Sequence, residues 1–191
     1  MTNPFFVADL KVEALRFKSS KVGDISIKVN NRQANAYAAN VSITGEGNDV
    51  QLDGTYFTQP QSSFDLNLAI NKLNMSSVES FTFGQLRNTS GTINGNLSVK
   101  GTVDQPNVRG DVTFNRTGFI LSYLNSYFTL RNERIRFDEQ GINFDQFTIR
   151  DSARNDAVID GYVYTKTFRD YRFDLQVTTD NFRALNTKQN N

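Results

Sequence analysis

The stretch that decides the fold is Ile93-Asn-Gly95-Asn-Leu97-Ser-Val99-Lys-Gly101, in which small or apolar residues alternate with polar ones. Successive side chains of a β-strand point to opposite faces of a sheet. The period of two therefore predicts a strand with one buried face and one solvated face. An α-helix would repeat its apolar positions every three to four residues instead.

The same alternation extends along the chain in both directions. It recurs at Ile25–Val29, Val50–Tyr56, Phe64–Ile70, Val108–Phe114, Ile135–Phe137, Ile142–Phe144, Phe147–Ile149 and Tyr171–Val177. Short turn sequences such as Asp104-Gln-Pro-Asn107 separate the runs, and short connections favour antiparallel neighbours. We therefore predict an all-β fold with an antiparallel-rich sheet and one or two short helices.

Three segments depart from plain alternation. Ser76-Ser-Val-Glu79 matches a capping box, which predicts a helix start where Ser76 accepts the amide N–H of Glu79. The run Phe119–Tyr127 fits a strand or a helix, and Phe182–Leu185 is compatible with a helical turn.

A faint internal repeat relates the two halves of the chain. Leu52-Asp-Gly54 and Phe64-Asp-Leu66 reappear as Ile159-Asp-Gly161 and Phe173-Asp-Leu175. Chance resemblance between amphipathic strands is one explanation, and duplication of a multi-strand module is the better one.

Composition excludes several classes of protein. The 191 residues include 21 Lys+Arg, 20 Asp+Glu, no His and no Cys, with a formal net charge of +1. This scattered charge argues against a nucleic-acid interface. Without His or Cys there is no Ser–His or Cys–His nucleophile pair and no zinc, haem or iron–sulfur site built on those ligands. We expect no metal and no cofactor.

Carboxylates are the remaining candidates for acid–base catalysis. Asp151, Asp156 and Asp160 flank one turn, and Asp49 and Asp53 flank another. A catalytic pair needs surroundings that separate two pKa values, usually apolar bulk beside one carboxyl group. These residues lie in loops or on polar strand positions, so we interpret them as turn formers and the protein as non-enzymatic.

The apolar side of the strands is rich in phenylalanine, with 16 Phe in the chain. In a closed sandwich, two such faces would bury each other and form an ordinary core. In one open, curled sheet they would line a trough for an apolar ligand. Composition alone favours the sandwich, and the pattern does not decide between the two.

A resemblance separates these alternatives. Gly91-Thr-Ile-Asn-Gly95-Asn-Leu-Ser-Val-Lys-Gly101, followed by Pro106-Asn-Val-Arg-Gly110, resembles a passage typical of the TamB family, within the AsmA-like superfamily. The resemblance is tightest over residues 91–182. It continues through Ile135-Arg-Phe137, Gly141-Ile-Asn-Phe144, Phe147-Thr-Ile-Arg-Asp151 and Ala157-Val-Ile-Asp-Gly161.

The resemblance implies an extended, curled, taco-like sheet with an open apolar groove. It implies a place in the Gram-negative periplasm and a role in carrying phospholipid from the inner to the outer membrane. On this basis residues 1–191 are interpreted as one segment of a longer protein, anchored in the inner membrane by a segment outside this sequence. The expected lipid-binding residues are Leu97, Val99, Val103, Val112, Phe114, Ile135, Phe137, Phe144, Phe147, Ile149, Ile159, Phe173, Leu175 and Val177.

Two other functions stay open from sequence. The first is a chaperone-like platform that adds a strand of an outer-membrane protein to a free sheet edge, with an Omp85-type barrel as partner. The second is a sugar-binding β-sandwich with exposed Tyr, although the Tyr positions suggest no shared platform. Phospholipid acyl chains are the expected ligand, nucleic acid is not expected as a partner, and open edges favour self-association.

Overall fold

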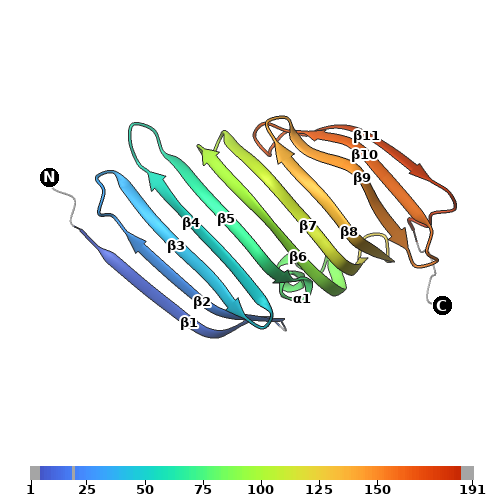
Figure 1. Cartoon of the computed structure of the whole chain (residues 1–191), viewed down its shortest axis with the longest axis horizontal. Helices are drawn as coiled ribbons and strands as arrows, with labels where there is room; N and C mark the ends of the chain where they lie inside the picture. Colours follow the sequence, from blue (N-terminus) through green and yellow to red (C-terminus); the bar gives the residue numbers. More distant parts are fainter. Residues whose placement is uncertain (1–4, 19, 186–191) are drawn as a thin grey trace.

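The computed structural model describes residues 5–18 and 20–185, which form one sheet of eleven strands in sequence order. Each strand is antiparallel to the next (Figure 1). The strands are β1 (Val7–Phe17), β2 (Ser20–Asn30), β3 (Ala36–Gly45), β4 (Asn48–Phe57), β5 (Ser63–Asn74), β6 (Leu86–Gly101), β7 (Pro106–Leu121), β8 (Ser126–Asp138), β9 (Gly141–Asp151), β10 (Asp156–Tyr164) and β11 (Arg172–Thr179).

The sheet is open, and β1 and β11 are its two edges. Figure 1 shows an extended ribbon of strands that curls towards its C-terminal end, where β9, β10 and β11 turn out of line with the other strands. The prediction of an all-β, curled and open antiparallel sheet is confirmed. The closed sandwich is wrong, because the described strands belong to a single sheet.

Strand register joins the alternating apolar residues into two rows that cross the whole sheet. The first, the Leu10–Phe173 row, is Leu10, Ile27, Val41, Leu52, Leu68, Leu97, Gly110, Phe137, Ile142, Val163 and Phe173. The second, the Val12–Leu175 row, is Val12, Ile25, Ile43, Val50, Ile70, Gly95, Val112, Ile135, Phe144, Gly161 and Leu175. Every member of both rows is apolar or glycine.

A third row lies on the opposite face of the sheet. It is Lys11, Ser26, Ser42, Gln51, Ala69, Asn96, Asp111, Arg136, Asn143, Tyr162 and Asp174. Only Ala69 lacks a polar side-chain group. The sheet therefore has one apolar face and one polar face, as the alternation of the sequence predicts.

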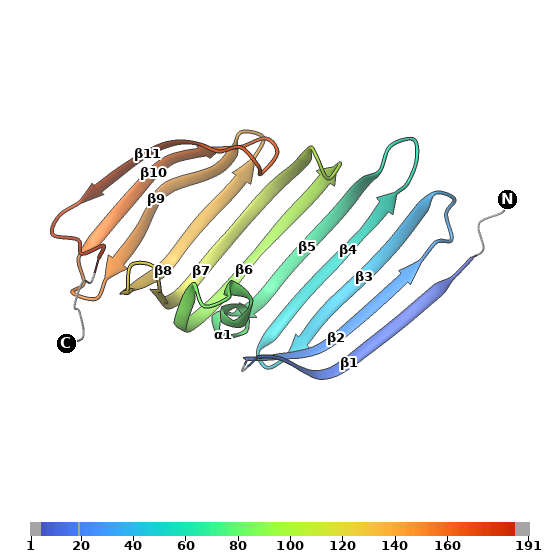
Figure 2. The ribbon, with the colours of Figure 1, turned by 180° about the vertical axis from the view of Figure 1, so that it is seen from behind.

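The short helix α1 (Met75–Glu79) continues into a 3₁₀ turn, η1 (Ser80–Thr82), and lies at one end of the strands where β5 connects to β6 (Figure 2). Met75 and Ser77 are buried there. The Ser77 hydroxyl donates to the carbonyl oxygen of Lys21 at 3.0 Å, and the rings of Phe17 and Phe81 stack 4.5 Å apart. The helix therefore fastens the β5–β6 connection to the start of β2.

The predicted capping box at Ser76 is wrong. The helix begins at Met75, two residues before the start that a Ser76 N-cap would give; its N-cap residue is Asn74, and no side chain caps it. The Glu79 carboxylate instead accepts hydrogen bonds from the backbone N–H and the hydroxyl of Thr89, at 2.9 and 2.8 Å. The Glu79 side chain therefore joins the helix to β6, a contact that the capping-box sequence does not predict.

The two other ambiguous segments are resolved as non-helical. The run Phe119–Tyr127 contains the end of β7, a turn over residues 122–125 and the start of β8. Residues 180–185, which follow β11, are irregular, and the Phe182 ring stacks on Phe128 of β8 with centroids 5.8 Å apart. This contact between distant parts of the chain replaces the helical turn.

The internal repeat corresponds to two hairpins with equivalent register. Gly54 of β4 pairs with Leu66 of β5, and Gly161 of β10 pairs with Leu175 of β11. The two copies of the sequence pattern therefore have matching register, one in the interior of the sheet and the other at its C-terminal edge.

Candidate functional site

The candidate site is the apolar face, defined as the Leu10–Phe173 row, the Val12–Leu175 row and the apolar side chains that flank them. The chain has an accessible surface of 12514 Å². A compact monomer of its mass, 21.6 kDa, would expose about 9,200 Å². The excess is what a single sheet without a second layer produces.

Exposure along the first row shows how the face is left uncovered. Its two ends are exposed, with Leu10 at 54% and Phe173 at 69% of full accessibility. The row members between them are half-buried, except for Val163, which is buried. No described helix or strand forms a second layer over the middle of these rows. Contiguous exposed apolar surface of this kind marks a binding surface in soluble proteins.

Thirteen of the fourteen expected lipid-binding residues lie in strands β6 to β11. Leu97, Phe137 and Phe173 belong to the first row, and Val112, Ile135, Phe144 and Leu175 belong to the second. The other six flank the rows. Val99 pairs with Leu66 and Phe114 with Ile93. Ile159 pairs with both Phe147 and Val177, and Ile149 pairs with Ala157.

Val103 is the exception. The alternation of the sequence runs on through Gly101 to Val103, but β6 ends at Gly101 and Val103 lies in the β6–β7 turn. Its side chain is exposed at 66% of full accessibility. The placement of Val103 on the strand face is therefore wrong, because period-two alternation does not reveal where a strand ends.

The N-terminal half of the apolar face was missed among the expected site residues. Strands β1 to β5 supply ten members of the two rows, all of them Leu, Ile or Val. The signal that could have found them is the same alternation, present at Ile25–Val29 and Phe64–Ile70.

Phenylalanine rings gather in the C-terminal half of the apolar face. Phe147 lies edge-on to Phe144 and Phe114, with centroids 5.4 and 6.2 Å apart. Phe128 contacts both Phe119 and Phe182. Phe147 and Phe128 are each only 5% exposed, so the neighbouring side chains cover these two rings almost completely. Edge-to-face pairs add roughly 0.5–1.5 kcal/mol beyond area burial.

Glycines in the two rows let neighbouring strands approach closely. Gly110 has a φ of 129° and Gly161 a φ of 119°. A Cβ at Gly110 would collide with the carbonyl oxygen of Asn96, and one at Gly161 with that of Asp174. Phe137 lies opposite Gly110 and Phe144 opposite Gly161 across the ladder. Small and large residues thus alternate between strands on the apolar face.

Asp151, the last residue of β9, accepts hydrogen bonds from the β9–β10 turn and from the segment that follows β11. Its carboxylate accepts backbone N–H groups of Ala153 and Asn155 at 2.8 Å and of Arg183 at 2.9 Å. Burial of the side chain opposes its ionisation, but these donors and the Asn155 amide outweigh burial and lower the pKa of Asp151 to about 2. The group stays ionised and holds the segment that carries Phe182.

Other carboxylates accept backbone amides where the strands are irregular. Asp24 accepts the N–H of Ala14 at 2.7 Å, and Asp160 accepts the N–H of Gln146 at 2.8 Å. Ala14 and Gln146 have φ values of 50° and 49°, so the ladder alone does not satisfy their amides. These acids therefore have a structural role at strand irregularities.

Asp156, the last of the Asp residues considered for catalysis near this turn, is also committed to structure. Its oxygens accept two hydrogen bonds from the Arg150 guanidinium at 2.6 Å each. This bidentate pair lowers the pKa of Asp156 and raises that of Arg150. Among the residues that the structure describes, no group of three or more His, Cys, Asp or Glu is arranged to hold a metal ion.

Comparison with protein families identifies the chain. The family model described as the TamB C-terminal domain matches residues 38–135, slightly more than half of the sequence. The chain belongs to the TamB family. The match runs from β3 to β8 and so includes the central part of both apolar rows. Comparisons with curated proteins and with solved structures gave no significant match.

The TamB family is a non-enzymatic transport and assembly component of the Gram-negative envelope. Within residues 5–18 and 20–185 of this TamB chain, no helix is both long and apolar enough to span a bilayer.

Proposed function

We propose that this TamB segment shelters the acyl chains of phospholipids on its apolar face, as part of a periplasmic path from the inner to the outer membrane. The observation that carries the proposal is the pair of rows that cross all eleven strands with only apolar residues and glycine. Such a surface needs an apolar partner, and an acyl chain needs no polar one.

The dimensions suit acyl chains. Neighbouring strands lie about 4.8 Å apart, so eleven strands present a face roughly 48 Å long when measured along the sheet. One acyl chain occupies about half of a hydrocarbon core of about 30 Å. Each row therefore offers several equivalent positions in succession, and each sheltered methylene contributes about 0.8 kcal/mol. Movement between equivalent positions breaks no hydrogen bond or ion pair.

A matched pair of neighbouring residues tests the proposal. Leu97 belongs to the first apolar row, and Ser98 lies on the opposite, polar face. A photo-crosslinking amino acid is placed at either position, the chain is expressed in the periplasm of Gram-negative cells, and adducts are identified by mass spectrometry. Phospholipid adducts are expected at position 97 and not at position 98, and equal labelling at both positions would contradict the proposal.

A substitution in the same row provides the second readout. Phe137→Asp places a charge on the apolar face and is expected to abolish the phospholipid adduct at position 97, as is Phe114→Asp. Ser98→Asp, on the polar face, is the control and is expected to leave the adduct unchanged. Circular dichroism establishes that each variant retains its sheet. A folded Phe137→Asp variant that still captures lipid normally would rule out this assignment of the site.

A second function is favoured by the two free edges. All eight residues of β11 are exposed, and β1 exposes Val7 and Leu10. An unpaired edge can accept a strand from another chain. The occupant would be a nascent outer-membrane protein delivered to an Omp85-type barrel, or a second copy of this chain.

Proline substitutions distinguish this function from lipid transport. The N–H groups of adjacent residues in a strand point to opposite sides of that strand. Of the two variants Gln176→Pro and Val177→Pro, one therefore removes an N–H from the free edge, and the other removes an N–H that pairs with β10. If strand addition is the function, the free-edge variant should lose capture of an outer-membrane β-strand peptide while keeping the phospholipid adduct at position 97. Retained peptide capture by both variants would exclude this edge.

A further inference from the structure

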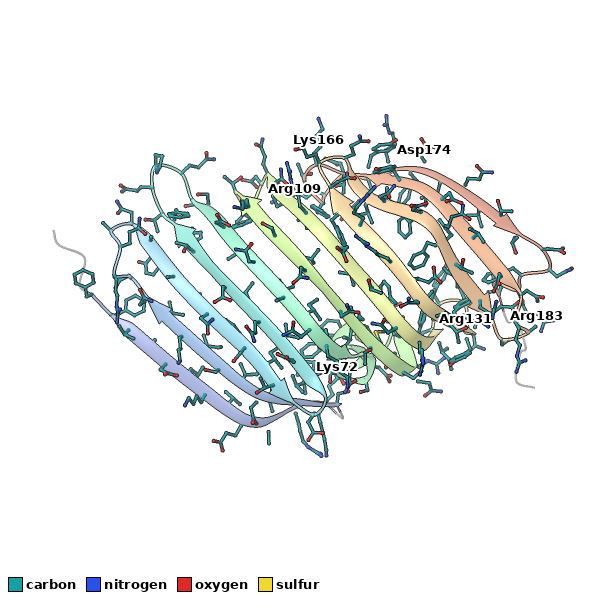
Figure 3. The ribbon with its side chains drawn as sticks, in the orientation of Figure 1. Lys72, Arg109, Arg131, Lys166, Asp174 and Arg183 are labelled. Atoms are coloured by element: carbon teal, nitrogen blue, oxygen red, sulfur yellow. The ribbon has the colours of Figure 1, made fainter. Side chains whose placement is uncertain are left out.

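The tips of three hairpins meet at one rim of the sheet. The β6–β7, β8–β9 and β10–β11 connections together line a cavity of about 390 Å³. Two ion pairs tie them together: Arg109 to Glu139, and Arg169 to Asp104 at 2.9 Å. The backbone N–H of Thr165 also donates to the carbonyl oxygen of Gln140 at 3.0 Å. Figure 3 shows Lys166 and Arg109 at this upper rim.

Three apolar residues line part of this cavity and connect it to the apolar face. Pro106, Val108 and Phe168 contribute to its lining. Val108 pairs with Val99, which in turn pairs with Leu66, so the cavity opens at the end of a line of apolar residues on the sheet. A ligand whose acyl chains lie on the apolar face can therefore place its polar end in this cavity.

The wall of the cavity carries charges of both signs. Lys166 is exposed and forms no ion pair with any residue in the described part of the chain, whereas Arg109 and Arg169 are already paired. Asp138 and Glu139 line the same cavity. Glu139 is the partner of Arg109, whereas Asp138 accepts hydrogen bonds from the neutral donors Gln140 N–H and Tyr162 OH and forms no ion pair within the described residues. A cavity lined by one unpaired ammonium and one unpaired carboxylate is poorly matched to a simple anion, because the carboxylate would repel it.

We propose that this rim binds the headgroup of a zwitterionic glycerophospholipid. Lys166 contacts the phosphate, and the carboxylate of Asp138 faces the ammonium group of the headgroup. The inference rests on the proposed function and deepens it, because it assigns the headgroup to one end of the strands.

The test separates the headgroup from the acyl chains. Glycerophosphoethanolamine, which has no acyl chains, is titrated into the isotopically labelled protein, and the backbone amide signals of Lys166 and Thr167 are followed by NMR. These signals are expected to shift. Lys166→Glu is expected to weaken binding about tenfold, as loss of a hydrogen bond to a charged group would. The matched control is Lys72→Glu, which makes the same charge change at the lower rim in Figure 3.

Three outcomes would overturn the headgroup site. These are unchanged binding by Lys166→Glu, equal weakening by Lys72→Glu, and inorganic phosphate binding as tightly as glycerophosphoethanolamine. The acyl-chain proposal is tested separately with diheptanoyl phosphatidylethanolamine. If the face shelters acyl chains, this lipid binds more tightly than the headgroup alone, and Leu97→Asp removes only that gain. Equal affinities would contradict the proposed function while leaving the headgroup site supported.

Discussion

The N-terminal strands β1 to β5 and the C-terminal strands β7 to β11 build the same apolar face in different ways. In the first group the two rows consist of Leu, Ile and Val, and the apolar side chains buried beside α1 lie at one end of the strands. In the second group the rows contain Phe and Gly, and the sheet curls. Within one continuous register, the strands that pair Phe with Gly are therefore the ones that curl, whereas the strands with rows of Leu, Ile and Val stay in line.

Gly110 is the position where a single substitution should disturb the C-terminal strands most. Gly110→Ala adds a Cβ against the Asn96 carbonyl at a φ of 129°, and we expect a loss of about 4 kcal/mol in the free energy of unfolding. Gly84→Ala is the control, since Gly84 also has a positive φ, 87°, but has nothing near its Cβ position. It should cost about 1 kcal/mol. Urea unfolding measures both, and similar losses would show that close strand approach at Gly110 is unimportant.

Phe147 tests whether the aromatic cluster supports the C-terminal strands. Phe147→Ala removes a buried ring between Phe114 and Phe144 and should lower the free energy of unfolding by about 3 kcal/mol. Phe173→Ala removes an exposed ring from β11 and should cost under about 1 kcal/mol. The comparison is made by urea unfolding at neutral pH. Equal losses would mean that the cluster packs no better than the exposed edge.

Asp151 gives the smallest effect and one that depends on pH. Its pKa of about 2 lies below the value of about 3.9 for an unfolded Asp, so it stabilises the fold above about pH 4. This contribution is lost as the pH falls towards 2. Asp151→Asn should therefore be less stable than the wild type at pH 6, and the difference should shrink towards pH 2.

Asp170→Asn, which alters an exposed carboxylate, is the control for the Asp151 measurement. Its stability should follow the wild type across the same range. A pH-independent difference between Asp151→Asn and the wild type would indicate that lost hydrogen-bond geometry, and not ionisation, accounts for the effect.

Much of the fold was predictable because strand alternation is a local property. The runs around Ile93–Gly101 and Val108–Phe114 gave the strands, and their short turns gave antiparallel neighbours. The choice between an open sheet and a sandwich was not predictable from alternation, since both arrangements require the same pattern. The resemblance to the TamB family is what favoured the open sheet.

The errors at the candidate site have a common physical cause. Val103 continues the alternation beyond the strand, and the capping motif at Ser76 is complete in sequence but unused in the structure. The contact of Phe182 with Phe128 also joins residues far apart in the chain. In each case a tertiary arrangement decides the outcome, and neither a period nor a local motif carries that information.

The order of the strands has a consequence for how the protein is made. Every strand pairs with the one synthesised just before it, so a chain that emerges N-terminus first can lengthen its sheet one hairpin at a time. No segment has to wait for a distant partner, and loop-closure costs stay low at each step. The newest strand is paired on one side and carries the growing free edge, so assembly can pause after any hairpin without leaving an earlier ladder incomplete.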